Sequence, residues 1–147
     1  MKMSTKARYG LRFMIDLAMQ SGMSSVPLKD VARRQNISEK YLWQVVTPLK
    51  KAGLIQTSRG ARGGFILALA PENITAFDVV TLLEGKELIV ACVAAPAACA
   101  RSPHCAARDV WRELAELMAA TLRGVTLKML ADKQQLNNQV RSVAYDI

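Results

Sequence analysis

A pair of short helices separated by only a few residues is the feature of this sequence that most restricts its fold. The first helix is predicted over residues 28–35, directly after Pro27. Ser38 is placed to cap the second helix, which runs to about Ala52 before Gly53 ends it. The connector, Gln-Asn-Ile-Ser, is long enough only for a tight turn. Two helices joined in this way are typical of a helix-turn-helix unit.

The second of these helices has two chemically different sides. At about 100° of rotation per residue, apolar and polar side chains gather on opposite sides of the helix. The apolar stripe consists of Leu42, Val45, Val46 and Leu49, and the polar row consists of Lys40, Gln44, Thr47 and Lys51. Lysine reaches DNA phosphates, and glutamine can pair with adenine in the major groove. We interpret the polar row as the reading face of a recognition helix; a solvated helix face is the alternative.

Two residues of this helix stand outside the simple pattern. Trp43 flanks the polar row, where its ring can either pack on the protein or touch DNA. Pro48 removes the backbone hydrogen bond to the carbonyl of Gln44, which favours a kink.

A glycine-rich hairpin is predicted after the helix pair. Residues 54–58 and 65–69 are expected to form two short strands. The six residues between them include three glycines, which permit a tight turn, and Arg59 and Arg62. Arginine is attracted to a narrow DNA minor groove. Alone the hairpin indicates only a turn, but after a helix-turn-helix it is typical of the wing of a winged-helix domain.

Positive charge is concentrated in the N-terminal half of the chain. Residues 1–70 hold 12 Lys/Arg against 3 Asp/Glu, a net +9, whereas residues 71–147 hold 8 against 9, a net −1. Such a field favours capture of a polyanion. Lys6 and Arg8 contribute to it from the start of a helix predicted over residues 4–22. The chain has one histidine and no paired nucleophile and base, so we do not expect an enzyme.

The C-terminal half is predicted to be helical and to carry a dimer interface. A short helix is expected over residues 75–84, and Ser102 and Pro103 are expected to begin a long helix that ends near Arg123. Thr126 then opens a last short helix. The long helix has an apolar stripe made of Val110, Trp111, Leu114, Leu117, Met118 and Leu122. We expect a homodimer, because bacterial operators are commonly two-fold; packing of the stripe on its own domain is the alternative.

These patterns divide the chain into four parts. We predict a winged helix-turn-helix domain over residues 1–84, a cysteine segment over 85–105, a dimerisation helix region over 106–133 and a polar, mobile tail over 134–147. No signal peptide is expected, and the most apolar run, 13 residues at 88–100, is too short to span a bilayer. We therefore expect a cytoplasmic protein without a membrane partner or a small-molecule substrate.

All three cysteines lie in one apolar segment. Cys92, Cys99 and Cys105 follow a C-x6-C-x5-C pattern, and an odd number of thiols cannot all form disulfides. Three thiolates suit a soft metal site, and Cys105 lies near a helix start, which favours the thiolate. The alternatives are small buried hydrophobes, a metal-free sensor in which two thiols oxidise to a disulfide, and a zinc site with His104 as fourth ligand.

Several sequence stretches together resemble the Rrf2 family of bacterial winged-helix regulators, in particular its IscR-, NsrR- and RirA-like members. The stretches are STKARYGLRFMIDLA, VPLKDVARRQNISEKYL, LKKAGLIQTSRGARGGFILA, ITAFDVV, the three cysteines before VWREL, and VTLKML. They cover about residues 3–133. The resemblance implies a dimer that binds double-stranded promoter DNA through the third helix and the wing.

The resemblance also implies an iron–sulfur cluster, with two or four irons, on Cys92, Cys99 and Cys105. The sequence departs from the IscR pattern in three ways: the first cysteine gap holds six residues instead of five, Arg108 stands where a histidine ligand is found, and Trp43 replaces a glutamate. Arginine stays protonated and cannot be a ligand. The fourth ligand therefore stays open, with His104 as one candidate and Asp16 of a partner's first helix as another.

The predicted DNA-binding set combines the residue patterns with the family positions, which map to Lys40, Trp43, Gln44 and Arg59. It comprises Lys6, Arg8, Ser38, Lys40, Tyr41, Trp43, Gln44, Thr47, Lys51, Arg59 and Arg62. The main prediction is a homodimeric DNA-binding regulator that senses iron–sulfur status, redox state or nitric oxide. A thiol- or partner-controlled regulator of the same fold and a winged-helix protein-interaction module are the alternatives.

Overall fold

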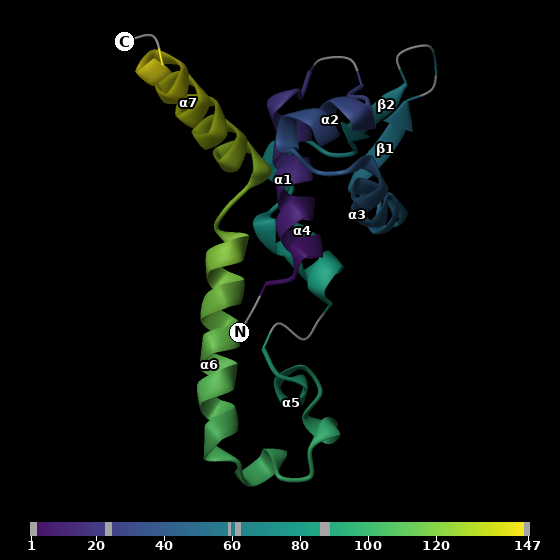
Figure 1. Cartoon of the computed structure of the whole chain (residues 1–147). Helices are drawn as coiled ribbons and strands as arrows, with labels where there is room; N and C mark the ends of the chain where they lie inside the picture. The colour runs from purple at the N-terminus through teal and green to yellow at the C-terminus, as the bar shows by residue number, and fades with distance from the viewer. Residues whose placement is uncertain (1–2, 23–24, 59, 61–62, 86–88, 146–147) are drawn as a thin grey trace.

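The computed structural model describes residues 3–22, 25–58, 60, 63–85 and 89–145 (Figure 1). These residues form a mainly helical fold with one two-stranded antiparallel sheet, which confirms the predicted fold class. The first part contains α1 (Thr5–Met19), α2 (Leu28–Gln35), α3 (Glu39–Lys51), β1 (Ile55–Ser58), β2 (Gly64–Leu67), the 3₁₀ helix η1 (Pro71–Asn73) and α4 (Ala76–Glu84). The second contains α5 (Ala91–Ala94), the 3₁₀ helices η2 (Pro96–Ala98) and η3 (Ser102–His104), α6 (Ala106–Arg123) and α7 (Leu127–Tyr145).

The first helix, α1, is at the centre of the hydrophobic core. Ser4 caps its start, because the Ser4 Oγ accepts a hydrogen bond from the Ala7 N–H at 3.0 Å. Phe13 and Met14 are fully buried, and α1 packs against α3, α4 and α7. Gly10 permits the close approach of α4, since a Cβ there would lie 2.0 Å from the Leu83 Cδ1 atom.

The predicted helix-turn-helix is formed by α2 and α3. Asn36 ends α2 in the left-handed conformation (φ 51°), and the Ile37 N–H donates back to the Ala32 carbonyl at 3.0 Å. This turn buries Ile37 in the core. Ser38 caps α3 as predicted, and α3 is continuous through Pro48.

The hairpin after α3 is fastened to the segment that leads into α2. β1 and β2 pair in the register Ile55↔Leu67 to Ser58↔Gly64. Val26 forms a further bridge with Phe65, in which each N–H donates to the other carbonyl, at 3.0 and 2.9 Å. Phe65 is buried in the core, so the base of the hairpin belongs to the domain rather than to a loose loop.

The cysteine segment and α6 extend away from this core. In Figure 1, α6 runs from the core to the far end of the molecule, and α5 lies beside it. No α6 residue is buried within one chain. Within the described residues, no helix is both long enough and apolar enough to cross a membrane.

The helix predicted over residues 4–22 ends earlier, at Met19, and two further helix boundaries differ from the sequence prediction. Ser102 and Pro103 form the short helix η3, and the extended Cys105 (φ −98°, ψ 101°) separates it from α6, which begins at Ala106. The last helix is longer than predicted: α7 runs for 19 residues and includes most of the expected polar tail. Leu127 and Ala131 anchor its start in the core, and after Gly124 the chain has no glycine or proline to end it.

Candidate DNA interface and cysteine segment

The outer side of α3 presents the polar row predicted from the sequence. Lys40, Gln44, Thr47 and Lys51 are all exposed, whereas the four apolar residues of the helix are at most 1% exposed. The row therefore offers two ammonium groups and one amide to solvent, which is the chemistry needed to contact phosphates and base edges. Its contact with DNA stays a prediction.

Trp43 flanks the polar row and packs against the hairpin; its contact with DNA stays a prediction. Its ring makes an edge contact with Phe65, with centroids 5.9 Å apart and planes at 76°. The side chain is nevertheless 53% exposed. The Thr47 hydroxyl donates to the Trp43 carbonyl at 2.8 Å, so Thr47 has its proton engaged and offers DNA its methyl group and oxygen lone pairs.

Ser38 and Tyr41 hold the start of α3 in place. The Ser38 Oγ accepts a hydrogen bond from the Tyr41 N–H at 3.2 Å. The half-buried Tyr41 ring meets the Tyr9 ring of α1 edge-on, with centroids 5.4 Å apart. These contacts connect the recognition helix to α1.

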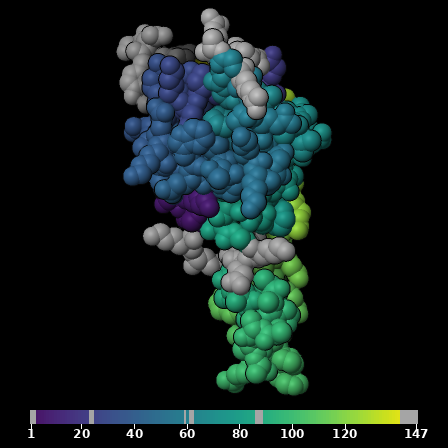
Figure 2. Space-filling view, turned by 90° about the vertical axis from the view of Figure 1, so that its right-hand side faces the viewer, coloured from purple at the N-terminus to yellow at the C-terminus, as the bar shows by residue number. Residues whose placement is uncertain are grey.

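The remaining predicted DNA contacts lie at the start of α1 and on the wing. Arg8 is exposed and donates to the Thr5 hydroxyl at 3.1 Å, and Lys6 is half-buried. Figure 2 shows the start of α1, in purple, just below the blue surface of α2 and α3. Arg59 and Arg62 lie outside the described residues.

A partly buried ion pair between α1 and α2 was not anticipated from the sequence. Asp16 is 3% exposed and accepts hydrogen bonds from Arg34 Nη2 at 2.5 Å, Arg34 Nε at 3.1 Å and Gln35 Nε2 at 2.9 Å. The side-chain hydrogen bond to Asp16 raises the pKa of Arg34, and burial opposes it to a lesser degree. Arg12 adds a hydrogen bond to the Gln35 Oε1 at 3.1 Å. The sequence does contain one indication of this ion pair, because Asp16 lies between Ile15 and Leu17 in an apolar stretch of the helix.

We expect Asp16→Asn to lower the free energy of unfolding by about 1.5–3 kcal/mol, because an amide cannot replace a carboxylate that accepts three hydrogen bonds. Asp30→Asn is the matched control, since Asp30 pairs at 3.6 Å with an Arg33 side chain that is 79% exposed. Such a surface pair contributes at most about 1 kcal/mol. Urea titrations of both variants measure the difference; equal losses would contradict a special role for Asp16.

The three cysteines form no disulfide bond and lie in the segment beside α6. Cys92 is in α5 and half-buried, Cys99 follows η2 and is exposed, and Cys105 is half-buried at the start of α6. His104 is exposed in η3. Ser102 is the buried residue of this segment, and its Oγ has no hydrogen-bond partner within the described residues.

The donor chemistry of this segment fits an iron–sulfur cluster, but the thiols are not assembled to hold one. Among the described residues, no three His, Cys, Asp or Glu side chains come together as a metal site. The described residues of the segment form only one-turn helices and include a single buried residue, so little packing has to be broken to rearrange it. Asp16 is a poor candidate for the fourth ligand, because its carboxylate is buried and paired with Arg34.

Arg108 has a structural role that its position in the sequence did not reveal. Its Nε donates to the Cys92 carbonyl at 2.9 Å and so ties α5 to α6. This hydrogen bond connects the main chain of the first cysteine to α6. Arginine at this position therefore does more than remove a possible ligand.

The helix-turn-helix pair and the hairpin packed behind it are those of winged-helix transcriptional regulators. The chain belongs to the Rrf2 family: the family model described as "Iron-dependent Transcriptional regulator" matches residues 3–133. The family consists of transcriptional regulators and not of enzymes, in agreement with the expectation from the sequence.

The relatives of this chain include regulators named CymR and regulators named IscR. The chain is 40% identical over 131 residues to the HTH-type transcriptional regulator CymR of Bacillus subtilis, covering 89% of this chain and 90% of the relative. It is 32% identical over 144 residues to IscR of Aliivibrio salmonicida, covering 98% and 83%. The solved structure of B. subtilis CymR, titled the global cysteine regulator, matches with a TM-score of 0.78, 38% identity and coverage of 90% and 98%. The oxidised form of Staphylococcus aureus CymR matches with a TM-score of 0.73, 40% identity and coverage of 89% and 96%.

Proposed function

We propose that this protein is a homodimeric regulator that binds double-stranded promoter DNA and is controlled by an iron–sulfur cluster in its cysteine segment. The observation that carries the DNA-binding part is the outer side of α3, where Lys40, Gln44 and Lys51 are exposed in one row. The wing beside α3 and the excess of positive charge in residues 1–70 support the same conclusion.

The apolar stripe of α6 supports the homodimer. Val110, Trp111 and Leu117 are 53%, 37% and 58% exposed. A row of large apolar side chains on an otherwise unburied helix needs a partner surface, and a second copy offers an identical one. A two-fold dimer would present two recognition helices to the two halves of an operator.

Three cysteines in one weakly packed segment support the cluster. Cys92, Cys99 and Cys105 are the residues that would hold it, and the cluster would supply a group whose loss or oxidation acts as the signal. Arg108 connects Cys92 to α6, the helix that carries the proposed dimer interface. A rearrangement of the cysteines would therefore change the position of α6.

A second candidate is control by the thiols alone. Two observations favour it: the thiols are not gathered into a metal site, and the chain is similar to a CymR structure solved in an oxidised form. Cys99 is exposed and so accessible to an oxidant. The visible absorption spectrum of protein purified without air, with iron and sulfide assays, separates the candidates, because only the cluster form is coloured.

The variant Lys40→Ala should weaken binding to the operator and to random DNA by about the same factor. It should also reduce the slope of log affinity against log salt concentration by about one. Gln44→Ala should instead cost roughly 1–3 kcal/mol on the operator and little on random DNA. Lys133→Ala is the control, since this exposed lysine is on α7.

Fluorescence anisotropy with operator and random duplexes at several salt concentrations measures both effects. The operator is first identified by selection from genomic fragments that contain promoters. A chain without sequence preference in that selection would be a protein-interaction module instead of a regulator. Unchanged affinity in both α3 variants would remove α3 from the interface.

A further inference from the structure

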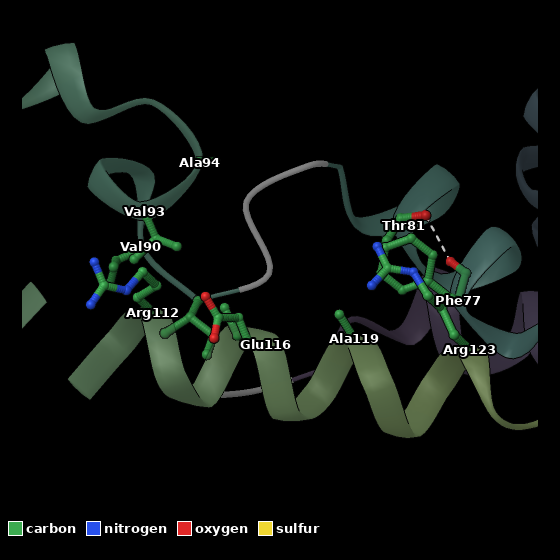
Figure 3. Close-up of a pocket in the computed structure, with 11 residues that line it drawn as sticks. Phe77, Thr81, Val90, Val93, Ala94, Arg112, Glu116, Ala119 and Arg123 are labelled. Carbon is green, nitrogen blue, oxygen red and sulfur yellow. Dashed lines mark hydrogen bonds between the residues drawn. The ribbon is translucent and has the colours of Figure 1, made fainter. Parts of the chain in front are cut away.

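A pocket of about 650 Å³ lies between α4, the start of the cysteine segment and α6 (Figure 3). Its volume falls in the range of small-molecule sites. Phe77 belongs to α4 and Ala119 to α6. Val93 belongs to α5, and Val90 directly precedes that helix. Apolar side chains from all three elements therefore line the pocket. None of its lining residues is a predicted DNA contact, a cysteine or His104.

One end of the pocket holds a cation that has no anionic partner among the residues that the structure describes. The guanidinium of Arg123 lies over the Phe77 ring, 3.9 Å from its centroid. Among the described residues, Arg123 makes no ion pair and no side-chain hydrogen bond. A guanidinium held over a ring still has N–H donors that the ring does not engage, and these can bind a carboxylate in a bidentate manner.

The other polar groups of the pocket are arranged so that they do not compete for this cation. The Thr81 hydroxyl, beside Phe77 in Figure 3, donates its proton to the Phe77 carbonyl at 2.7 Å. Glu116 lies toward the other end of the pocket, near Arg112. Arg112 itself pairs with Asp109 at 3.0 Å. Arg123 is thus the group left to bind an anion.

The pocket faces away from the proposed dimer interface. Arg112, Glu116, Ala119 and Arg123 are spaced four, three and four residues apart and so share one side of α6. The exposed Val110, Trp111 and Leu117 are rotated from Arg112 by roughly 160°, 100° and 140° about the helix axis. A dimer centred on Val110 and Leu117 therefore leaves the pocket accessible.

We propose that this pocket binds a small amphipathic carboxylate, with its apolar chain against Val90, Val93 and Ala119 and its carboxylate on Arg123. Such a ligand would touch α4 of the winged-helix domain and the start of the cysteine segment at the same time. Binding there is therefore linked to the relative position of these two parts of the protein. The site is a second signal input beside the thiols and does not depend on a bound cluster.

Isothermal titration calorimetry of the full chain tests this proposal with decanoate, used below its micelle concentration, and with decanol as the neutral probe. Decanoate should bind, and decanol should bind more weakly. Arg123→Met, which keeps the stem on Phe77 but removes the charge, should weaken decanoate binding by roughly tenfold to a hundredfold. Arg33→Met removes an exposed arginine of α2 and should change nothing.

A pair of alanine variants on α6 tests the location. Ala119→Leu fills the pocket and should abolish binding, whereas Ala120→Leu, its exposed neighbour outside the pocket, should leave binding unchanged. Matched thermal midpoints of the two variants verify that both fold. No heat of binding, equal affinity for decanoate and decanol, or binding that survives Ala119→Leu would each overturn the proposal. The titration contains no DNA, so its failure leaves the proposed regulatory function untouched.

Discussion

Replacing Cys92, Cys99 or Cys105 singly with alanine is expected to remove the visible absorption from protein purified without air, together with its bound iron and sulfide. The expectation rests on the ligand number. Three thiolates leave one iron position for a weaker ligand, so a cluster that loses one of the three has only two protein thiolates to hold it. None of the three cysteines is buried, so removing any of them costs the fold little.

The fourth ligand is tested in the same preparation with His104→Ala. His104 is exposed and adjoins Cys105, so its removal should not disturb the packing of the segment. Colour lost in this variant would make the histidine a ligand; colour kept would leave that position to another group. Colour kept in all three cysteine variants would defeat the cluster hypothesis.

A colourless wild-type protein that also resists reconstitution would point to the thiol mechanism. Mass spectrometry after exposure to oxygen would then show a loss of two hydrogens in the wild type, and Cys99→Ala would identify whether the exposed thiol takes part. The predicted DNA contacts of α3 do not depend on this outcome.

The parts of the fold that the sequence predicts well are those specified by neighbouring residues. The two sides of α3 follow from helical periodicity, and the Ser38 cap and the turn at Asn36 follow from residues within one helical turn. The wing is predicted from its glycines and flanking apolar strands. Each of these signals is local, so one sequence is enough to detect it.

The missed features depend on residues far apart in the chain. Arg34 reaches Asp16 from another helix, and Arg108 reaches Cys92 across 16 residues. Neither pair has a pattern that periodicity could reveal. The length of α7 was missed for another reason: its polar residues suggested a tail, although polar residues with good helix propensity can continue a helix that its first turns anchor in the core.

Some glycines of the winged-helix domain have backbone atoms where a Cβ would be. Among these, Gly64 is the one whose substitution should destabilise the domain most. A Cβ at Gly64 would lie 2.3 Å from the Val26 carbonyl oxygen, 2.4 Å from the Val26 carbonyl carbon and 2.7 Å from the Pro27 nitrogen. All three are backbone atoms, so no side chain can rotate away to make room. Gly64→Ala must therefore separate β2 from the segment that leads into α2.

That separation has a cost that can be estimated from the contacts it breaks. The two hydrogen bonds between Val26 and Phe65, at 3.0 and 2.9 Å, are next to the clash, and each contributes about 1 kcal/mol. Overpacking adds about 1–3 kcal/mol. We expect Gly64→Ala to lower the free energy of unfolding by roughly 3–5 kcal/mol. Each kcal/mol lost should lower the midpoint of thermal unfolding by about 2–4 °C.

Gly124→Ala is the matched control for this experiment. Gly124 ends α6 in a right-handed helical conformation (φ −71°), and a Cβ there would have its nearest neighbour at 3.5 Å. This substitution should be neutral or stabilise the fold by up to about 1 kcal/mol. Because Phe65 also contacts Trp43, movement of β2 should disturb the recognition helix, and Gly64→Ala should weaken operator binding even at temperatures where the protein remains folded. A Gly64→Ala protein as stable as Gly124→Ala would mean that the wing is not fastened at Val26.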